Sequence, residues 1–322
     1  MKHFFRKNNI FLWIELAIAV VVLLLFISIR YNASVNAEKR VSVIVEKSSD
    51  AKWDSFRQGL SDAAKDQNIN IVMVSTGELV SAEQEQKLID REIEMGAKAL
   101  IVEPAPGERT SGLLQKAARN VPVLLVEADC FGGSYLNRVS FDDEELGRAI
   151  GAEVLSDFSG DVSGKKIGVL SGRLNTQQAS ERLSGLSESL GKPDFRFLLS
   201  NADLKGLGED ISSFGSVDIL VALDTYSLEV AGANAVQQEG SPALIYGIAS
   251  SDKAYYYLDR NIVKALIVPD EWEEGYQAMS RTVQLLHHTS ASLSDATAGY
   301  TVVRRDNLFS EENQDRLFTG SK

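Results

Sequence analysis

Short apolar segments rich in β-branched residues alternate with helical patterns along most of this chain. The first segment, residues 41–46, leads through a polar stretch into a helical pattern in which Trp53, Phe56 and Leu60 share one face. Further strand patterns follow at residues 69–74, 99–102, 121–126, 138–141, 166–170, 195–200, 217–222, 243–248, 263–268 and 299–304. Consecutive strand–helix–strand units form a parallel sheet with helices on both faces. The pattern therefore predicts an α/β protein with two doubly wound parallel-sheet lobes of similar size.

The composition agrees with two lobes and excludes one class of partner. A chain of 322 residues is long enough for two lobes that each bury a core. The formal net charge of -12 and the pI near 4.9 are the opposite of the basic surface that nucleic-acid binding requires. We therefore expect no nucleic-acid partner.

The N-terminal segment has a different composition from the rest of the chain. Two lysines and one arginine precede an apolar run over residues 10–29, whose only ionisable residue is Glu15. At about 1.5 Å per residue, a helix of this length crosses a hydrocarbon core of about 30 Å. Positive charges before such a run favour a cytoplasmic N-terminus, with the main domain outside.

We therefore predict a signal anchor that forms one transmembrane helix within residues 1–30, followed by a stalk over residues 31–39. The main domain is then extracytoplasmic and attached to the cell membrane by a single pass. A cleaved secretory signal peptide is the alternative, because residues 35–37 have the small side chains of a cleavage site.

Sequence motifs of several enzyme classes are absent. The chain has no Gly-x-Gly-x-x-Gly, P-loop or Gly-x-Ser-x-Gly pattern, and it has three histidines in all. The single cysteine, Cys130, cannot form an internal disulfide. His287 and His288 are adjacent and have no evident third partner, so they do not indicate a metal site. We expect no catalytic residues, no cofactor and no metal; a glycoside-acting enzyme is the weaker alternative.

The polar loop after the first strand is the first candidate for ligand contact. In open α/β sheets, ligands bind outside the carboxyl ends of the strands. Asp50 can accept hydrogen bonds there and Trp53 can stack on a ligand, although Trp53 could equally belong to the core. In the acidic run at residues 142–145, Asp142 is placed to cap a helix. The negative charge of Asp143 could interact favourably with the positive end of the helix dipole, or Asp143 could contact a ligand.

Several short motifs occur in a recognisable order along the chain. They are Trp53 with Gly59, Glu85-Gln86, Arg91-Glu92, residues 96–101, residues 121–123, Phe141-Asp142-Asp143 with Gly147, Glu181-Arg182 with Gly185-Leu186, residues 221–224, Tyr246-Gly247, and Val268 with Gly275-Tyr276. In this order and spacing, the chain from residue 40 to about residue 308 resembles the type I periplasmic (sugar-type) substrate-binding proteins of the ribose and galactose receptor group. Sugar-type repressors share this core, but they carry a DNA-reading domain where this chain has its apolar segment.

The resemblance implies a hinged molecule. Three crossovers would join a first lobe, residues 40–141 and 269–298, to a second lobe, residues 142–268 and 299–310, with a tail at 311–322. A ligand would lie between the lobes, which would close around it.

The resemblance also implies a set of ligand-binding positions. Asp50, Lys52 and Trp53 lie where the family has a polar group and stacking aromatic rings, and Asp143 and Asp224 lie at family Asn or Asp positions. Other positions depart from the family. An Arg after the fourth strand is replaced by Ala128, between Glu127 and Asp129, and a second ligand Arg is replaced by Ser180. A family Asp is replaced by Ala249, and a family Gln by Pro269. The candidate ligand-binding residues are therefore Asp50, Lys52, Trp53, Glu127, Asp129, Asp143, Ser180, Asp224, Ala249 and Pro269.

These departures alter the expected ligand. Arginine forks and carboxylates commonly hold sugar hydroxyls, and most of the arginines are missing. The remaining acids are either solvated rim residues or contacts for a polyol or an amine-bearing ligand. The sequence thus predicts a solute-binding protein that closes on a small polar, carbohydrate-like ligand for an ABC permease. A sensor subunit that signals to a membrane histidine kinase is the alternative.

Overall fold

The structure is a computed structural model. It describes residues 18–24, 40–49, 51–77, 81–105, 109–127, 136–172, 176–191, 193, 195–199, 217–237, 243–287 and 293–318.

The first lobe is built on a six-stranded sheet in the order β11-β5-β4-β3-β1-β2, and every neighbouring pair is parallel. Its strands are β1 (Arg40–Ile44), β2 (Asn70–Met73), β3 (Ala99–Val102), β4 (Val123–Val126), β5 (Asn137–Ser140) and β11 (Ala296–Thr297). Its helical elements are η1 (Ala51–Trp53), α2 (Asp54–Gln67), α3 (Ala82–Glu94), α4 (Arg109–Ala117) and α10 (Glu271–His287). Strands β1, β3 and β4 are buried almost throughout because helices cover both faces of the sheet.

The second lobe repeats this plan with the order β12-β10-β9-β8-β6-β7. Its strands are β6 (Ile167–Ser171), β7 (Phe195–Leu199), β8 (Ile219–Ala222), β9 (Leu244–Ile248), β10 (Val263–Pro269) and β12 (Tyr300–Arg304). Its helices are α5 (Asp143–Asp157), α6 (Gln177–Ser189), α8 (Thr225–Gln237), α9 (Asp252–Asp259) and α11 (Glu311–Leu317). Strand β12 pairs with β10 in the antiparallel direction, and the other pairs are parallel.

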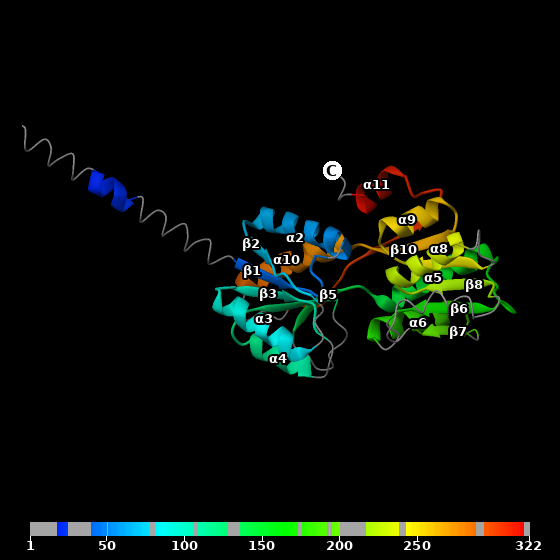
Figure 1. The fold of residues 1–322 in the computed structure, drawn as a ribbon, viewed down its shortest axis with the longest axis horizontal. Coiled ribbons are helices and arrows are strands. Elements are labelled where there is room, and N and C mark those ends of the chain that lie inside the picture. The colour runs from blue at the N-terminus through cyan, green and yellow to red at the C-terminus, as the bar shows by residue number, and fades with distance from the viewer. Residues whose placement is uncertain are drawn as a thin grey trace, which may run out of the picture.

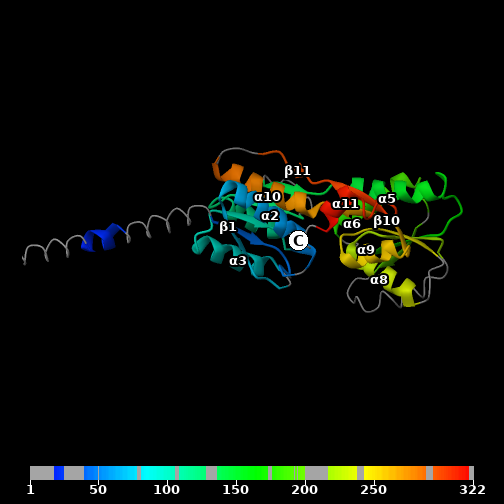
Figure 2. The ribbon, with the colours of Figure 1, turned by 90° about the horizontal axis from the view of Figure 1, so that it is seen from above.

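The chain passes between the two sheets three times. It leaves the first sheet after β5, returns after β10 and leaves again after β11. The two lobes lie side by side along the longest axis of the molecule (Figures 1 and 2). This arrangement confirms the predicted α/β architecture of two parallel-sheet lobes. Residues 311–317, which the sequence interpretation left in a tail, form α11.

A close helix pair covers a face of each sheet. In the first lobe α2 packs on α10, and a Cβ added at Gly59 would lie 2.0 Å from the Trp272 carbonyl oxygen. In the second lobe α5 packs on α6, and a Cβ added at Gly185 would lie 1.9 Å from the Glu144 carbonyl oxygen. Glycine at these positions lets the two backbones touch, which explains why both residues belong to the motifs noted above.

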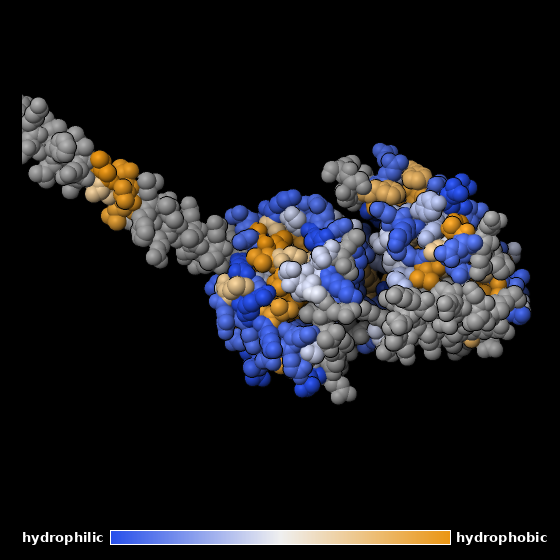
Figure 3. All heavy atoms as spheres, viewed as in Figure 1, coloured by the Kyte–Doolittle hydropathy of each residue, from blue (hydrophilic) through white to orange (hydrophobic). Residues whose placement is uncertain are grey.

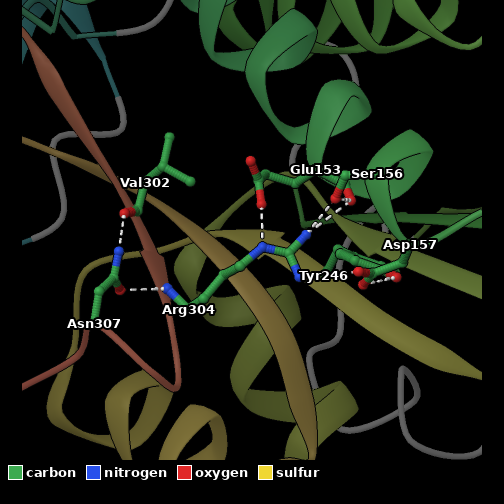
Figure 4. Close-up of polar contacts among 7 residues, drawn as sticks. All are labelled: Glu153, Ser156, Asp157, Tyr246, Val302, Arg304 and Asn307. Carbon is green, nitrogen blue, oxygen red and sulfur yellow. Dashed lines mark hydrogen bonds and ion pairs between the residues drawn. The ribbon is translucent and has the colours of Figure 1, made fainter. Parts of the chain in front are cut away.

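Within the second lobe, an arginine joins the last strand, β12, to helix α5 (Figure 4). The Nε atom of Arg304, at the end of β12, lies 2.5 Å from Glu153 Oε2 on α5, and its Nη1 atom lies 3.0 Å from Asp157 Oδ1. Tyr246 of β9 donates from its hydroxyl to Asp157 Oδ2 at 2.7 Å. Asn307 accepts from the Arg304 backbone N–H at 2.7 Å. Strand β12 is thereby attached to both a helix and a central strand of its sheet.

Most of the predicted membrane segment and stalk lies outside the described residues. Residues 18–24 are helical, and their apolar side chains are exposed (Figure 3). Among the residues that the structure describes, no helix is both long enough and apolar enough to span a bilayer.

Candidate functional site

The carboxyl end of β1 places Lys52 and Trp53 beside the end of β3. The Trp53 side chain is only 3% exposed, and its Nε1–H donates to the Glu46 carbonyl at 2.9 Å. Its ring packs edge-on against Phe56, with the ring centroids 5.2 Å apart. Lys52 is exposed, and its Nζ lies 4.3 Å from the centroid of the Trp53 ring. The indole is therefore a core group with a cation above it.

Glu103, which follows β3, connects the two loops. Its Oε2 accepts from the Glu46 backbone N–H at 2.6 Å, and its Oε1 lies 3.5 Å from Lys52 Nζ. Burial raises the pKa of this carboxyl, while Lys52 and the Glu46 amide act in the opposite direction. Sequence reasoning missed Glu103, although its position directly after a buried strand was the same signal that selected the loop after the first strand.

Glu127 follows β4 and makes a contact between the lobes. Its backbone is in the left-handed region at φ 48°, which is uncommon for a residue with a side chain. Its Oε2 accepts from Gln178 Nε2, on α6 of the second lobe, at 3.0 Å. Its backbone N–H donates to Glu274 Oε1 of α10 at 3.4 Å. Glu127 therefore lies at the boundary of the two lobes, where the sequence predicted a ligand contact.

Asp143 lies at the start of α5, on the second lobe's side of this boundary. Its Oδ1 is 2.6 Å from Arg182 Nε, and Arg182 also donates from Nη1 to the Leu223 carbonyl at 2.8 Å. Burial raises the pKa of Asp143 to about 6, because desolvation outweighs the favourable charge of Arg182; the negative charge of Glu127 acts in the same direction as burial. Asp142 caps α5 by accepting from the Glu145 backbone N–H at 2.9 Å, as predicted.

Asp224, which follows β8, is held by three donors. Its Oδ2 accepts from the Gly172 backbone N–H at 2.8 Å and from the Ser227 hydroxyl at 2.9 Å. Its Oδ1 accepts from the Ser227 backbone N–H at 2.8 Å. Asp224 therefore ties the loop after β6 to the start of α8.

The other predicted residues occupy different environments. Ala249 is 1% exposed, and its backbone N–H donates to the Ile267 carbonyl at 3.0 Å. Ser180 lies on the exposed side of α6. Pro269 ends β10 and lines a depression at the crossover together with Ser55, Ser250, Tyr255 and Glu271. Asp50 and Asp129 lie outside the described residues.

The first turn of α10 adds two carboxyls that the sequence analysis did not select. Glu271 has its pKa raised to about 8, first by burial and then by the charge of Glu127, while Lys52 and a hydrogen bond with Ser250 of the second lobe lower it. Glu274 is 1% exposed, and burial raises its pKa well above the ordinary value. Acidic residues in a first helical turn are usually explained by the helix dipole. The sequence therefore offered no separate reason to select these two residues as site residues.

Together these residues form a polar region at the boundary between the lobes. Figure 3 shows a crevice between the two lobes on the face in view. The carboxyl ends of β1, β3 and β4 and the first turns of α5 and α10 contribute to this region. Carboxylates, an amide, a lysine and an arginine can bind a hydroxyl-rich or charged small molecule by hydrogen bonds.

Several solved structures that are similar to this chain are described as carbohydrate or sugar-binding proteins. One is a carbohydrate transporter solute-binding protein from Agrobacterium radiobacter in complex with D-arabinose, with TM-score 0.75, 12% identity, and coverage of 86% of this chain and 98% of that one. Another is GanP, a glucose-galactose binding protein from Geobacillus stearothermophilus, with TM-score 0.72, 14% identity, and coverage of 84% and 99%. A third is a sugar-binding protein of a sugar ABC transporter from Bacillus halodurans, with TM-score 0.71, 15% identity, and coverage of 84% and 99%.

A search of curated protein sequences found no match. The sequence model of the periplasmic binding protein domain matches residues 41–290, which include most of both lobes. At such low identity the solved structures establish the fold, and the sequence model establishes the family. The chain belongs to the periplasmic binding protein family, and its fold is that of the type I sugar-binding members.

Proposed function

We propose that this protein is an extracytoplasmic solute-binding protein that takes a small polar, carbohydrate-like ligand between its lobes. The observation that carries the proposal is the contact between Glu127 and Gln178, at 3.0 Å, because it brings the carboxyl end of one sheet against the second lobe. Ligands of open α/β sheets bind at such carboxyl ends. Asp143 and Arg182 add an acceptor and a donor on the opposite side of the boundary.

The proposed ligand class rests on hydrogen-bonding chemistry and on the similar structures. The boundary offers several carboxylates, a carboxamide and two cations, which suit hydroxyl groups. Similar structures bind D-arabinose or are named as glucose-galactose binding proteins. Among the predicted ligand residues, Trp53 is buried, and Asp224 already accepts three hydrogen bonds within the second lobe. Asp143 is also buried, at 5% exposed, and is paired with Arg182. Glu127, which is half-buried and contacts the second lobe, is therefore the strongest candidate for direct contact.

A thermal-shift screen tests this function. The full chain is heated with pentoses, hexoses, polyols and amines, and a ligand that binds only the native state raises the melting temperature. At a concentration of about 100 times Kd the added stability is about 2.7 kcal/mol, which corresponds to a rise of several degrees. A complete absence of shifts from the sugars and polyols would contradict a carbohydrate-like ligand.

Two variants locate the binding site. Glu127→Ala should remove most of the shift caused by the best sugar. Glu188→Ala should retain it, because Glu188 pairs with Arg148 and its side chain is 63% exposed on the outside of α6. An equal shift in the Glu127 variant and the natural protein would remove Glu127 from the site.

The proposal includes attachment to the membrane and delivery to an ABC permease. The anchor is supported by the apolar run over residues 10–29, and the transport role by the likeness to a sugar-binding protein of an ABC transporter. Alkaline extraction of membranes tests the anchor, since an anchored chain stays in the pellet and a cleaved one is released. Ligand uptake that depends on both this protein and a permease tests the transport role.

A further inference from the structure

The negative charge of Glu127 acts on carboxyl groups from both lobes. Glu103 after β3, Glu271 and Glu274 on α10, and Asp143 on α5 each experience its negative charge. Asp143 belongs to the second lobe and the others to the first. We call these five residues, including Glu127, the boundary carboxyls.

Few positive charges oppose the boundary carboxyls. Lys52 acts on Glu103 and Glu271, and Arg182 pairs with Asp143. Additional negative charges also act on the cluster: Glu46 on Glu103, Asp270 on Glu271, and Glu181 on Asp143. The described residues around Glu127 therefore carry an excess of negative charge at the lobe boundary.

Glu127 is one link between the lobes, beside the hydrogen bond between Glu271 and Ser250. Among the residues that the structure describes, its side chain contacts the second lobe through a neutral amide, Gln178 Nε2, at 3.0 Å. Its charge also acts across the boundary on Asp143, where the two carboxylates repel each other. Bringing the lobes together removes water from between these groups, which strengthens the repulsion. Adding a proton to Asp143 removes this repulsion.

We propose that the approach of the two lobes is coupled to proton uptake by Asp143 and Glu271, with Glu127 as the charged group that connects the lobes. Low pH then favours the near arrangement of the lobes, and high pH favours their separation. This proposal goes beyond the proposed function because it concerns the lobes without ligand.

The direction follows from proton linkage. Burial and neighbouring negative charges raise the pKa of Asp143 to about 6 and that of Glu271 to about 8. The part of each shift that comes from contact between the lobes is absent when they separate. The near arrangement therefore gains stability below the ordinary carboxyl pKa and loses it as the pH rises through the raised values. Each linked proton changes the ratio of the two arrangements by up to about tenfold per pH unit.

Distance measurements between spin labels test the coupling directly. Lys87→Cys on α3 and Ser184→Cys on α6 place labels at exposed positions on different lobes, in a full chain that also carries Cys130→Ala. Without ligand, the population of the shorter distance should increase as the pH is lowered from about 8.5 to about 5.5. Equal distributions at both pH values would overturn the proposal, whether or not any sugar binds.

Variants identify the responsible group. Glu127→Gln keeps an acceptor for Gln178 but has no charge, so the shorter distance should already be populated at high pH and the pH dependence should fall by at least about half. Glu188→Gln removes an exposed carboxyl of α6 and should leave the pH dependence unchanged. An unchanged pH dependence in the Glu127 variant would overturn its assigned role. Asp143→Asn provides the same test from the second lobe if the Glu127 variant does not fold.

Discussion

The indole of Trp53 belongs to the core of the first lobe. It is 3% exposed, contacts Phe56 and donates to the Glu46 carbonyl. A large buried aromatic ring contributes mainly through the surface that it removes from water. Because Trp53 follows the loop after β1, its packing holds that loop in place. The Lys52 ammonium group lies over the face of the Trp53 ring. Trp53 therefore shapes the site by positioning its neighbours.

Replacing Trp53 tests this role by its effect on stability. Trp53→Ala should lower the free energy of unfolding by about 3–5 kcal/mol, because it leaves a large cavity. Trp53→Phe should cost less, since it keeps much of the ring and loses the hydrogen bond to Glu46, worth about 1 kcal/mol. Urea denaturation without ligand measures both values. A loss below about 1 kcal/mol for Trp53→Ala would show that the ring lies outside the core.

Glu271 should make stability depend on pH. Its pKa is raised to about 8 in the folded protein, mainly by burial. A carboxyl with a raised folded pKa stabilises the fold fully below its unfolded pKa, and this contribution is lost as pH rises through the folded value. Glu271→Gln should therefore raise the free energy of unfolding at about pH 9 by an amount on the order of 1 kcal/mol, with little gain at about pH 5. Thermal unfolding at the two pH values provides the measurement. An equal effect at both would contradict the assignment.

The residues of the site were only partly predictable from the sequence. Glu127 was selected through the family resemblance, and Asp143 both by its place at a helix start and by the resemblance. The structure places both at the lobe boundary. Glu103, Glu271 and Glu274 were missed because acids at such places have ordinary explanations as caps or solvated groups. Glu274 is buried and Glu271 half-buried on α10, which returns to the first lobe late in the chain, and Glu103 is half-buried after β3. That information is tertiary and has no local pattern.

The two close helix pairs are the elements that define each lobe. Gly59 and Gly275 let α2 touch α10, while Gly147 and Gly185 let α5 touch α6. Each pair joins segments that carry site residues at their ends. Asp143 begins α5, and Glu271 begins α10. Loosening a pair would therefore displace the boundary carboxyls as well as the core.

A single methyl group tests the packing of one pair. Gly185→Ala should destabilise the protein by about 1–3 kcal/mol, because the added Cβ would lie 1.9 Å from a backbone oxygen that cannot move independently. Gly112→Ala is the matched control: Gly112 lies in α4 with nothing within 4 Å of the added Cβ. There the substitution should raise stability by up to about 1 kcal/mol through helix propensity. Similar effects at the two positions, measured by chemical denaturation, would contradict the packing argument.

Strands and helices were predictable to the extent that their own residues encode them. Continuous apolar runs predicted β1, β3, β4 and β8 because both faces of these strands are buried. Strand direction has no such local signal, so the antiparallel pairing of β12 with β10 emerged only from the structure. The seven residues of α11 are mostly polar. The residue that follows them, Phe318, contacts Tyr255 of α9 with ring centroids 5.5 Å apart.

The whole molecule is a pair of similar lobes joined by three crossovers. The order of elements, the parallel sheets and the return of the chain through α10 followed from the alternation of patterns and from the family resemblance. The crossovers allow the lobes to rotate as bodies while their cores remain intact. Contact between the lobes involves polar side chains such as Glu127 and Gln178.

The central claim is that a small polar ligand draws the two lobes together. The distance between spin labels at positions 87 and 184 measures this approach directly. The distance is recorded at fixed pH, before and after addition of the sugar that gives the largest thermal shift. We expect a broad or long distance distribution to become a single shorter one at saturating ligand, and Glu127→Ala to prevent this change at the same concentration. A distribution that stays unchanged while the ligand is bound would contradict the claim.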